Sequence, residues 1–420
     1  MKANFQIIVT LEGKAMYIKR HLEDKFLQMS SFFKAVLVTG ARQVGKTTML
    51  KQLGGDRAYV SLDNGRELEL AKTDPEMFLQ RHKPPVIIDE VQKAPELFPY
   101  IKIACDSTDE TGLFWLTGSE QFSLMRNIQE SLAGRIGIMT LYPLSLSEMT
   151  GVRFPSPISF EMDALIERER LAAPFDLPSV FQTIWRGGMP QVQNATAAEH
   201  QAYYDAYIDT YLMRDVLSVT TIRDELSFRK FVTACAAFNA CQLNVASVAG
   251  AADISVPTAK AWLDLLVRLH IVFLLQPYSN NKLKRLAKTP KLYFTDPGFA
   301  AHLCRWLTPE ILVEGSAAGN YFENFAVIEL IKDLEYSAAP YDLTYYRDSN
   351  SKEIDLFLQL GRHIHPLEIK LSANPDKREV RKFSVLDANA IERGAGGIVC
   401  MSPSVMPIDK TDFLIPVNIL

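Results

Sequence analysis

Short, unbroken apolar runs alternate with helix-length amphipathic stretches in the first 150 residues of the chain. The runs Ala35–Thr39 and Val86–Ile88, and a further run at 113–116, are of strand length and carry no internal charge. Strands that are buried on both faces of a parallel sheet show this continuous apolar pattern, whereas half-exposed strands alternate. The pattern therefore predicts an α/β fold built on a parallel sheet.

The pattern changes further along the chain. Between Gly151 and Asp176, prolines and the charged run "ERER" interrupt the periodicity, which indicates a surface connection or a short helix. Residues 202–219 place apolar and aromatic side chains at helical spacing, a stripe that is more often core than ligand site. The predicted organisation is an N-terminal extension (1–15), an α/β domain (16–150), a helical lid and connection (151–225), a helix-turn-helix region (226–312) and a C-terminal α/β domain (313–420).

Residues 245–294 predict a winged helix-turn-helix. A short helix (Val245–Ala251), a tight turn and a second helix (Pro257–Leu269) precede an apolar strand. The wing would hold the basic run Lys282, Lys284, Arg285, Lys288 and Lys291, flanked by Tyr278 and Tyr293. Such a patch can contact a phosphate backbone, and the second helix offers few side chains for base edges, so we expect contact without sequence specificity. The alternative is a winged helix used only for packing between subunits.

The most specific motif is "GARQVGKTT", which lies between the run Ala35–Thr39 and an apolar helix pattern. Its glycines, Gly40 and Gly45, let backbone N–H groups fold around phosphate oxygens, and the following helix adds the positive end of its dipole. In this pattern Lys46 reaches the β- and γ-phosphates, and the Thr47 hydroxyl ligates Mg²⁺. With Thr48 as a further loop residue, the motif predicts binding of ATP and Mg²⁺.

Polar residues follow the next two apolar runs. Asp89 can hold the Mg²⁺ shell, and Glu90 can polarise a water for attack on the γ-phosphate. The alternative is an acidic pair that only caps the next helix. Ser119 or Thr117 can orient the attacking water, since ligands collect at the carboxyl ends of parallel strands; alternatively the hydroxyl only starts a turn. Arg135, just before another strand, can stabilise transition-state charge in a neighbouring subunit or be an ordinary surface arginine.

Seven stretches occur in a specific order: "GARQVGKTT", "VIIDEVQKAPELF", "LTGSEQF", "SLAGR", "LYPLSLSEM", "GGMP" and "YLMRDV". From Met16 onward the chain resembles the bacterial and archaeal AAA-type ATP-binding proteins that carry a C-terminal domain of unknown function 4143. The resemblance implies an AAA-like P-loop NTPase fold for 16–150, with Ser119 at the sensor position and Arg135 as the arginine-finger candidate. It also implies that "GGMP" (187–190) belongs to a lid near the nucleotide. A homo-oligomer formed through the ATPase domain is expected.

Two strand-length runs near the C-terminus carry charges among Ile, Leu and Phe. Asp355 lies on the first, and Glu368 and Lys370 share one face of the second because they are two positions apart. Glu323 lies in the opening turn of a preceding helix. The set resembles a PD-(D/E)XK nuclease core, with Glu323, Asp355 and Glu368 as ligands of a divalent metal and Lys370 as the catalytic lysine. The alternative is a structural ion pair in a fold that has lost cleavage.

Composition narrows these hypotheses. The net charge of −4 does not indicate a protein that binds nucleic acid, so any such binding would depend on local basic patches. Five cysteines without a C-x-x-C pair favour reduced thiols in a cytoplasm over disulfides or zinc, and no apolar run is long enough to span a membrane. We therefore predict a cytoplasmic α/β ATPase that acts on nucleic acid, DNA favoured, as an ATP-dependent nuclease would. The alternative is a nucleotide-controlled switch or assembly ATPase whose nuclease-like domain binds a partner without cutting.

Overall fold

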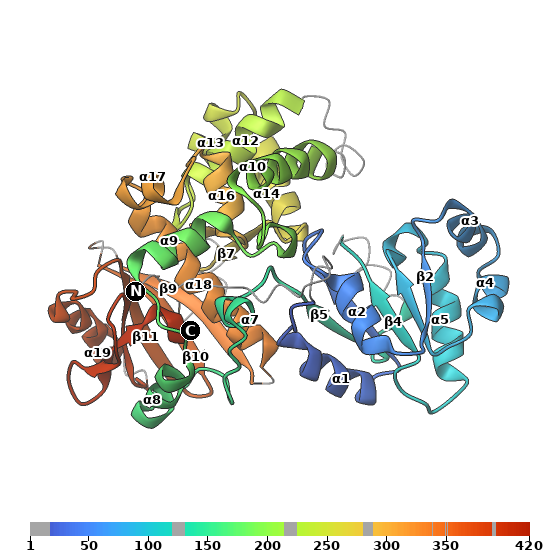
Figure 1. The fold of residues 1–420 in the computed structure, drawn as a ribbon, viewed down its shortest axis with the longest axis horizontal. Coiled ribbons are helices and arrows are strands. Elements are labelled where there is room, and N and C mark those ends of the chain that lie inside the picture. The colour runs from blue at the N-terminus through green and yellow to red at the C-terminus, as the bar shows by residue number, and fades with distance from the viewer. Residues whose placement is uncertain are drawn as a thin grey trace. The chain divides into compact units, whose positions relative to one another are not determined.

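The computed structural model describes residues 17–119, 131–213, 225–279, 289–337, 339–348, 350, 352–388 and 392–420. They fall into two compact units. The N-terminal unit comprises Tyr17–Leu144 with Arg268–His270, and the C-terminal unit comprises Ser145–Val267 with Ile271–Leu420. Figure 1 shows their helices and strands and labels many of them. In the described part of the chain, no helix combines the length and the apolar character that a membrane crossing would need.

A parallel sheet forms the centre of the N-terminal unit. Its described strands lie in the order β2-β3-β4-β1-β5, and every pairing is parallel. The strands are β1 (Ala35–Thr39), β2 (Ala58–Ser61), β3 (Val86–Asp89), β4 (Phe114–Thr117) and β5 (Ile136–Thr140). The helices are α1 (Leu22–Phe32), α2 (Lys46–Gly54), α3 (Gly65–Thr73), α4 (Pro75–Arg81) and α5 (Leu97–Asp106). The α/β fold expected from the apolar runs is confirmed.

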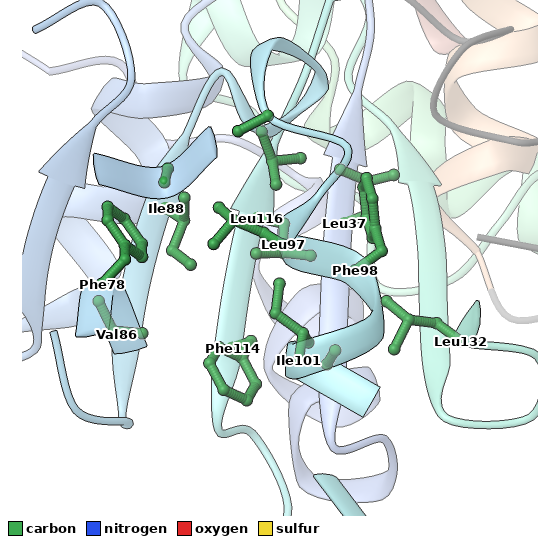
Figure 2. Packing of buried hydrophobic residues seen from close by; sticks show 14 of the residues in the cluster. Leu37, Phe78, Val86, Ile88, Leu97, Phe98, Ile101, Phe114, Leu116 and Leu132 are labelled. Atoms are coloured by element: carbon green, nitrogen blue, oxygen red, sulfur yellow. The ribbon is translucent and has the colours of Figure 1, made fainter. Parts of the chain in front are cut away.

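Helices cover both faces of this sheet. Leu97 and Ile101 of α5 lie beside Leu116 and Phe114 of β4, and Phe98 lies beside Leu37 of β1, as Figure 2 shows. On the opposite face, the ring of Phe26 from α1 meets that of Trp115 edge-on at 4.7 Å between centroids. Successive side chains of a strand point to opposite faces, so Trp115 and its two neighbours serve different layers. All residues of β1, β3 and β4 are buried, which explains why these runs have no polar alternation.

The first half of the C-terminal unit is mostly helical. Its helices are α7 (Leu146–Thr150), α8 (Met162–Leu171), α9 (Leu177–Arg186), α10 (Ala197–Ala206), a π-helical turn (Tyr207–Leu212), α12 (Glu225–Ala237), α13 (Val245–Ala251) and α14 (Val256–Arg268). A small antiparallel sheet has the order β6-β8-β7, formed by β6 (Cys241–Gln242), β7 (Val272–Leu275) and β8 (Lys291–Phe294). The two helices and the strand expected for a helix-turn-helix thus occur at their expected places.

The second half of this unit contains a mixed sheet of order β13-β14-β12-β11-β10-β9. Its strands are β9 (Tyr341–Arg347), β10 (Glu353–Leu360), β11 (His363–Lys370), β12 (Gly396–Cys400), β13 (Met406–Pro407) and β14 (Asp412–Pro416). Strands β9, β10 and β11 pair antiparallel, whereas β11, β12 and β14 pair parallel. Helices α16 (Pro297–Leu303), α17 (Pro309–Glu314), α18 (Ala318–Tyr336) and α19 (Ser384–Ala388) and the 3₁₀ turn Lys377–Phe383 complete it.

Candidate functional site

The loop between β1 and α2 has the backbone conformation that its glycines permit. Gly40 has φ +137° and Gly45, which precedes the first residue of α2, has φ +96°. A Cβ atom on Gly40 would lie 2.2 Å from the carbonyl oxygen of Leu141, so this position has no room for a side chain. Thr48 is exposed in the first turn of α2. The backbone amides of this loop and helix end can therefore turn toward an anion.

Lys46 is held inside the loop. Its ammonium group donates to the carbonyl oxygens of Gly40 and Ala41 at 2.9 and 2.8 Å. Burial lowers the pKa of Lys46 to about 8, and the nearby carboxylates of Glu90 and Asp89 act in the opposite direction. The cation is thus fixed at the loop that the sequence predicts to bind phosphate.

Asp89, at the carboxyl end of β3, connects three elements. Its Oδ1 accepts a hydrogen bond from the Thr47 hydroxyl at 2.6 Å and another from the Thr117 hydroxyl. Its Oδ2 accepts a bond from the Tyr59 hydroxyl at 3.0 Å, and burial together with Asp89 raises the pKa of Tyr59 to about 12. A hydroxyl and a carboxylate oxygen side by side are ligands that Mg²⁺ accepts, so Thr47 and Asp89 fit the predicted cation.

Glu90 and Ser119 are joined through a residue that sequence reasoning missed. Gln92 donates from Nε2 to Glu90 Oε2 and, at 3.4 Å, to the Ser119 hydroxyl. The backbone N–H of Glu90 donates to the Thr117 hydroxyl at 3.1 Å, and Glu90 has a left-handed φ of 59°. The position of Gln92, two residues after Glu90 in "IIDEVQ", was the only sequence signal for this contact. Glu90 is therefore oriented by groups from two neighbouring segments.

Arg20 is a second residue that sequence reasoning missed. It is buried, and its guanidinium donates to the carbonyl oxygens of Val44 and Tyr142, both at 2.7 Å. Val44 belongs to the predicted phosphate-binding loop, so Arg20 fixes this loop to the segment after β5. An isolated arginine before α1 gave no motif from which this contact could be predicted.

Arg135 lies just before β5, where its carbonyl oxygen accepts the N–H of Ala35 at 3.1 Å. It is thus at the amino ends of β1 and β5, while the phosphate-binding loop follows the carboxyl end of β1. Its side chain is 33% exposed and forms an ion pair with Asp106 at 2.5 Å. Within one chain Arg135 therefore lies at the sheet edge opposite the loop, and its action on a neighbouring subunit stays a prediction.

The "GGMP" stretch is buried within the C-terminal unit. The N–H of Gly188 and the hydroxyl of Tyr204 both donate to the Asp296 carboxylate, at 3.1 and 2.7 Å. A Cβ atom on Gly187, which has φ +78°, would lie 2.3 Å from that carboxylate. The glycines therefore serve this internal contact, and their expected place beside a nucleotide stays a prediction.

Part of the predicted wing is not on the surface. Lys282, Lys284, Arg285 and Lys288 lie outside the described residues. Lys291 is 3% exposed, Tyr293 is fully buried, and the ring of the half-buried Tyr278 packs edge-on against Phe357. The expectation that Lys291 and Tyr293 contact a phosphate backbone is therefore wrong. Each pairs instead with carboxylates inside the C-terminal unit.

The four predicted nuclease-like residues are brought into one cluster. Lys370 lies 3.1 Å from Asp355 Oδ2 and 2.6 Å from Glu368 Oε2. Lys291 lies 3.0 Å from Glu323 Oε1 and 3.5 Å from Asp355 Oδ1. Sequence reasoning missed a fourth carboxylate, Glu353, whose Oε1 lies 2.7 Å from Lys291 Nζ. Its position two residues before Asp355 on the same strand face was the available signal.

Burial and mutual repulsion set the protonation of this cluster. Burial, and then the charge of Asp355, raise the pKa of both Glu323 and Glu368 to about 7. Burial also acts on Asp355, but Lys291 and Lys370 outweigh it and lower the pKa of that carboxyl. Although burial opposes it, the surrounding carboxylates raise the pKa of Lys291 above its ordinary value. Lys291 therefore carries its charge inside the cluster.

The arrangement of this cluster bears on the predicted divalent metal. Within the described ranges, no group of three or more His, Cys, Asp or Glu residues is arranged to hold a metal ion. The ammonium group of Lys291 lies within 3.5 Å of oxygens of Glu323, Glu353 and Asp355, which are the oxygens that a cation would need. The residues present thus do not fit a divalent cation, because a lysine already neutralises them.

Comparisons with known proteins agree with the N-terminal site. Residues 32–150 match the family model of the AAA domain. Residues 177–310 and 318–420 match two families described as Domain of unknown function (DUF8612) and Domain of unknown function (DUF4143). The uncharacterized proteins Rv2008c of Mycobacterium tuberculosis and Mb2031c of Mycobacterium bovis are each 26% identical over 386 residues, which span 91% of this chain and 80% of each relative.

A solved structure is also similar. The Walker-type ATPase PABY2304 of Pyrococcus abyssi aligns with 70% of this chain and 99% of its own, at 18% identity and a TM-score of 0.45. The match of residues 32–150 to the AAA domain coincides with the loop that holds Lys46 and with the acidic end of β3. Residues 32–150 are therefore an AAA-type P-loop ATPase domain, and residues 318–420 are a domain of unknown function (DUF4143).

Proposed function

We propose that this ATPase is a Mg²⁺-dependent, nucleotide-controlled switch whose C-terminal unit does not cut nucleic acid. The observation that carries the proposal is the position of Asp89. One carboxylate accepts hydrogen bonds from Thr47 next to the loop, from Thr117 on β4 and from Tyr59 on β2. If Asp89 exchanges one hydrogen-bond partner for another group, its hydrogen bonds with Tyr59 on β2 and Thr117 on β4 therefore change as well.

The residues of the site have separable tasks. Lys46 and the loop amides bind the β- and γ-phosphates, and Thr47 and Asp89 would hold Mg²⁺. Bound Mg²⁺ neutralises phosphate charge and orients the γ-phosphate. Glu90 accepts a proton from the attacking water, and the amide of Gln92 fixes the orientation of its carboxylate. Ser119, which also contacts Gln92, would orient the same water.

The switch follows from the hydrogen bonds that Asp89 must exchange. Thr47 and Asp89 would hold the cation with the same oxygens that form their direct hydrogen bond at 2.6 Å, so that bond would be lost on binding. The hydroxyls of Thr117 and Tyr59, which both donate to the Asp89 carboxylate, would then have to reorient or find another acceptor. A nucleotide can shift such an equilibrium only as far as it binds one arrangement more tightly than the other.

Hydrogen exchange of the full chain tests this proposal. Glu90→Gln should retain ATP, so its exchange can be compared with and without Mg²⁺–ATP, with Lys46→Ala as the control that does not bind. We expect ATP to slow exchange in the loop 40–48, to change exchange around Tyr59 and Thr117, and to change it in the C-terminal unit. A change confined to the loop 40–48 would contradict a switch and leave only an ATP-binding site.

A second candidate function, binding of nucleic acid, is favoured by an exposed basic segment. Lys377, Arg378 and Arg381 are exposed on the 3₁₀ turn that follows β11, close to Lys370 and Lys382, which both pair with Glu368. Clustered cations bind phosphate backbones without reading sequence, and release of counterions makes such binding salt-dependent. DNA is the partner expected from the sequence, with the chain binding rather than cutting it.

Fluorescence anisotropy with labelled single-stranded and duplex DNA tests this second function. Replacing Lys377 and Arg381 by alanine should weaken binding by about tenfold and reduce its salt dependence. The matched control replaces Lys72 and Lys83, two exposed lysines of the N-terminal unit, and removes the same charge. Equal weakening by both double variants would mean that only net charge matters, and no weakening would exclude the segment as a contact surface.

A further inference from the structure

The ammonium group of Lys291 lies at a point where three carboxylates converge. Its Nζ is 2.7 Å from Glu353 Oε1, 3.0 Å from Glu323 Oε1 and 3.5 Å from Asp355 Oδ1. The lysine is the first residue of β8, and the carboxylates come from α18 and β10. Three separate elements of the C-terminal unit therefore meet at one positive charge.

This charge is shielded from solvent. Lys291 is 3% exposed, and the Tyr293 hydroxyl closes one side by donating to Glu323 Oε1 at 2.7 Å. Buried carboxylates are stable only when a cation or hydrogen-bond donors compensate them. Removing Lys291 would take away the one positive charge that Glu323 Oε1, Asp355 Oδ1 and the partly exposed Glu353 Oε1 share, although Glu353 also pairs with Arg347 through its other oxygen. Oxygen atoms grouped around one point are what a hard divalent cation requires.

The neighbouring half of the cluster has a cation of its own, Lys370. Asp355 Oδ2 accepts from the N–H of Ile369 at 2.9 Å and from Lys370 at 3.1 Å, so only its Oδ1 depends on Lys291. Lys370 also pairs with Glu368. The two lysines therefore have different partners: in the described structure, Lys291 pairs with Glu323 and Glu353, and Lys370 does not.

We propose that the Lys291 ammonium is a tethered cation that holds the position of a divalent ion in the C-terminal unit. The domain thereby keeps its carboxylates without binding metal. This inference deepens the non-cutting part of the proposed function. It also gives the lysine a definite chemical task, since a fixed single charge neutralises the carboxylates yet has no open coordination position for a water or a phosphate oxygen.

Counting bound Mn²⁺ by electron paramagnetic resonance tests the inference. All proteins carry Asp89→Asn, which removes the carboxylate of the nucleotide site. We expect no Mn²⁺ on the chain that keeps Lys291, about one Mn²⁺ per chain for Lys291→Met, and loss of that ion when Asp355→Asn is added. Lys291→Arg is the control that keeps the charge, and it should bind no Mn²⁺.

Two results would overturn the inference. One is Mn²⁺ binding by the chain that keeps Lys291, if that binding is lost on Asp355→Asn. The other is a Lys291→Met protein that takes up no Mn²⁺, whether it remains folded or loses structure by circular dichroism. A Lys291→Met protein that folds only with Mn²⁺ supports the inference. The outcome is separable from that of the switch, because hydrogen exchange with ATP is measured on chains that keep Lys291.

Discussion

Gly40 shows how a single residue can be required for two physical reasons. Its φ of +137° lies outside the range of ordinary L-residues, and an added Cβ atom would meet the Leu141 carbonyl at 2.2 Å. We expect Gly40→Ala to lower the free energy of unfolding by about 1–3 kcal/mol or more, as strained backbone positions do, and to abolish ATP binding. Urea unfolding and ATP titration measure the two effects.

Gly65→Ala is the matched control for Gly40→Ala. Gly65 is the first residue of α3, and a Cβ atom added there would meet no heavy atom within 4 Å beyond its own chain neighbours and helix backbone. The alanine variant should therefore unfold at nearly the same urea concentration as the wild type and bind ATP normally. Equal stability of the two alanine variants would show that the contact with Leu141 is not important.

The lowered pKa of Lys46 predicts a pH dependence of ATP binding. Burial places this pKa at about 8 without nucleotide, and phosphate favours the protonated lysine, so the complex binds more protons than the free protein above that pH. Binding must then weaken as pH rises, by about tenfold per unit above pH 8, and stay nearly constant just below it. Isothermal titration from about pH 7 to about pH 9.5 measures this slope.

Lys46→Arg provides the control for the pH series, because a guanidinium group keeps its charge in this range. If the arginine variant still binds ATP, its affinity should not fall as the pH rises above the pKa of Lys46 in the wild type. A wild-type affinity that is independent of pH over the same interval would contradict the assigned position of the Lys46 charge.

At the scale of elements, the local sequence pattern was sufficient to predict a structure wherever that structure depends on one segment alone. The fully buried strands β1, β3 and β4 have unbroken apolar sequences, and the loop motif requires glycine for local reasons. Glu368 and Lys370 were placed on one strand face by their spacing, and Asp355 was singled out as a charge within an apolar run. The sequence therefore predicted the sheet, the loop and most members of the C-terminal cluster.

Contacts between distant segments could not be predicted in this way. Lys291 follows a basic run in sequence, yet its environment is set by α18 and β10. Tyr59 meets Asp89 only because β2 pairs with β3, with Ser61 opposite Asp89. Local sequence describes what a residue is next to along the chain, whereas charge compensation depends on what the fold places around it.

At the scale of the whole molecule, Arg135 raises the question of assembly. Arg135→Ala should keep ATP binding and lose turnover, if the arginine stabilises charge at the site of a neighbouring subunit. Mixing it with an excess of Glu90→Gln subunits should restore part of the activity, because one type of interface then has both groups. ATP turnover of the mixture against that of each variant alone is the measurement.

The ion pair with Asp106 supplies the control for assembly. Asp106→Asn removes the partner of Arg135 without removing the arginine. If Arg135 only stabilises its own chain through this pair, Asp106→Asn should lose as much turnover as Arg135→Ala, and mixing should restore none. Loss with Arg135→Ala alone, followed by recovery on mixing, is the result expected for an arginine that acts between subunits.

The division of tasks between Lys46 and Glu90 is the central claim, and it is tested most directly by measuring ATP affinity and steady-state hydrolysis together. In Mg²⁺, Lys46→Ala should lose ATP binding, because the cation at the phosphates is gone. Glu90→Gln should bind ATP like the wild type yet hydrolyse it about 10²–10⁴-fold more slowly, since only the proton acceptor is lost. Equal ATP affinity of the wild type and Lys46→Ala, or undiminished turnover by Glu90→Gln, would contradict it.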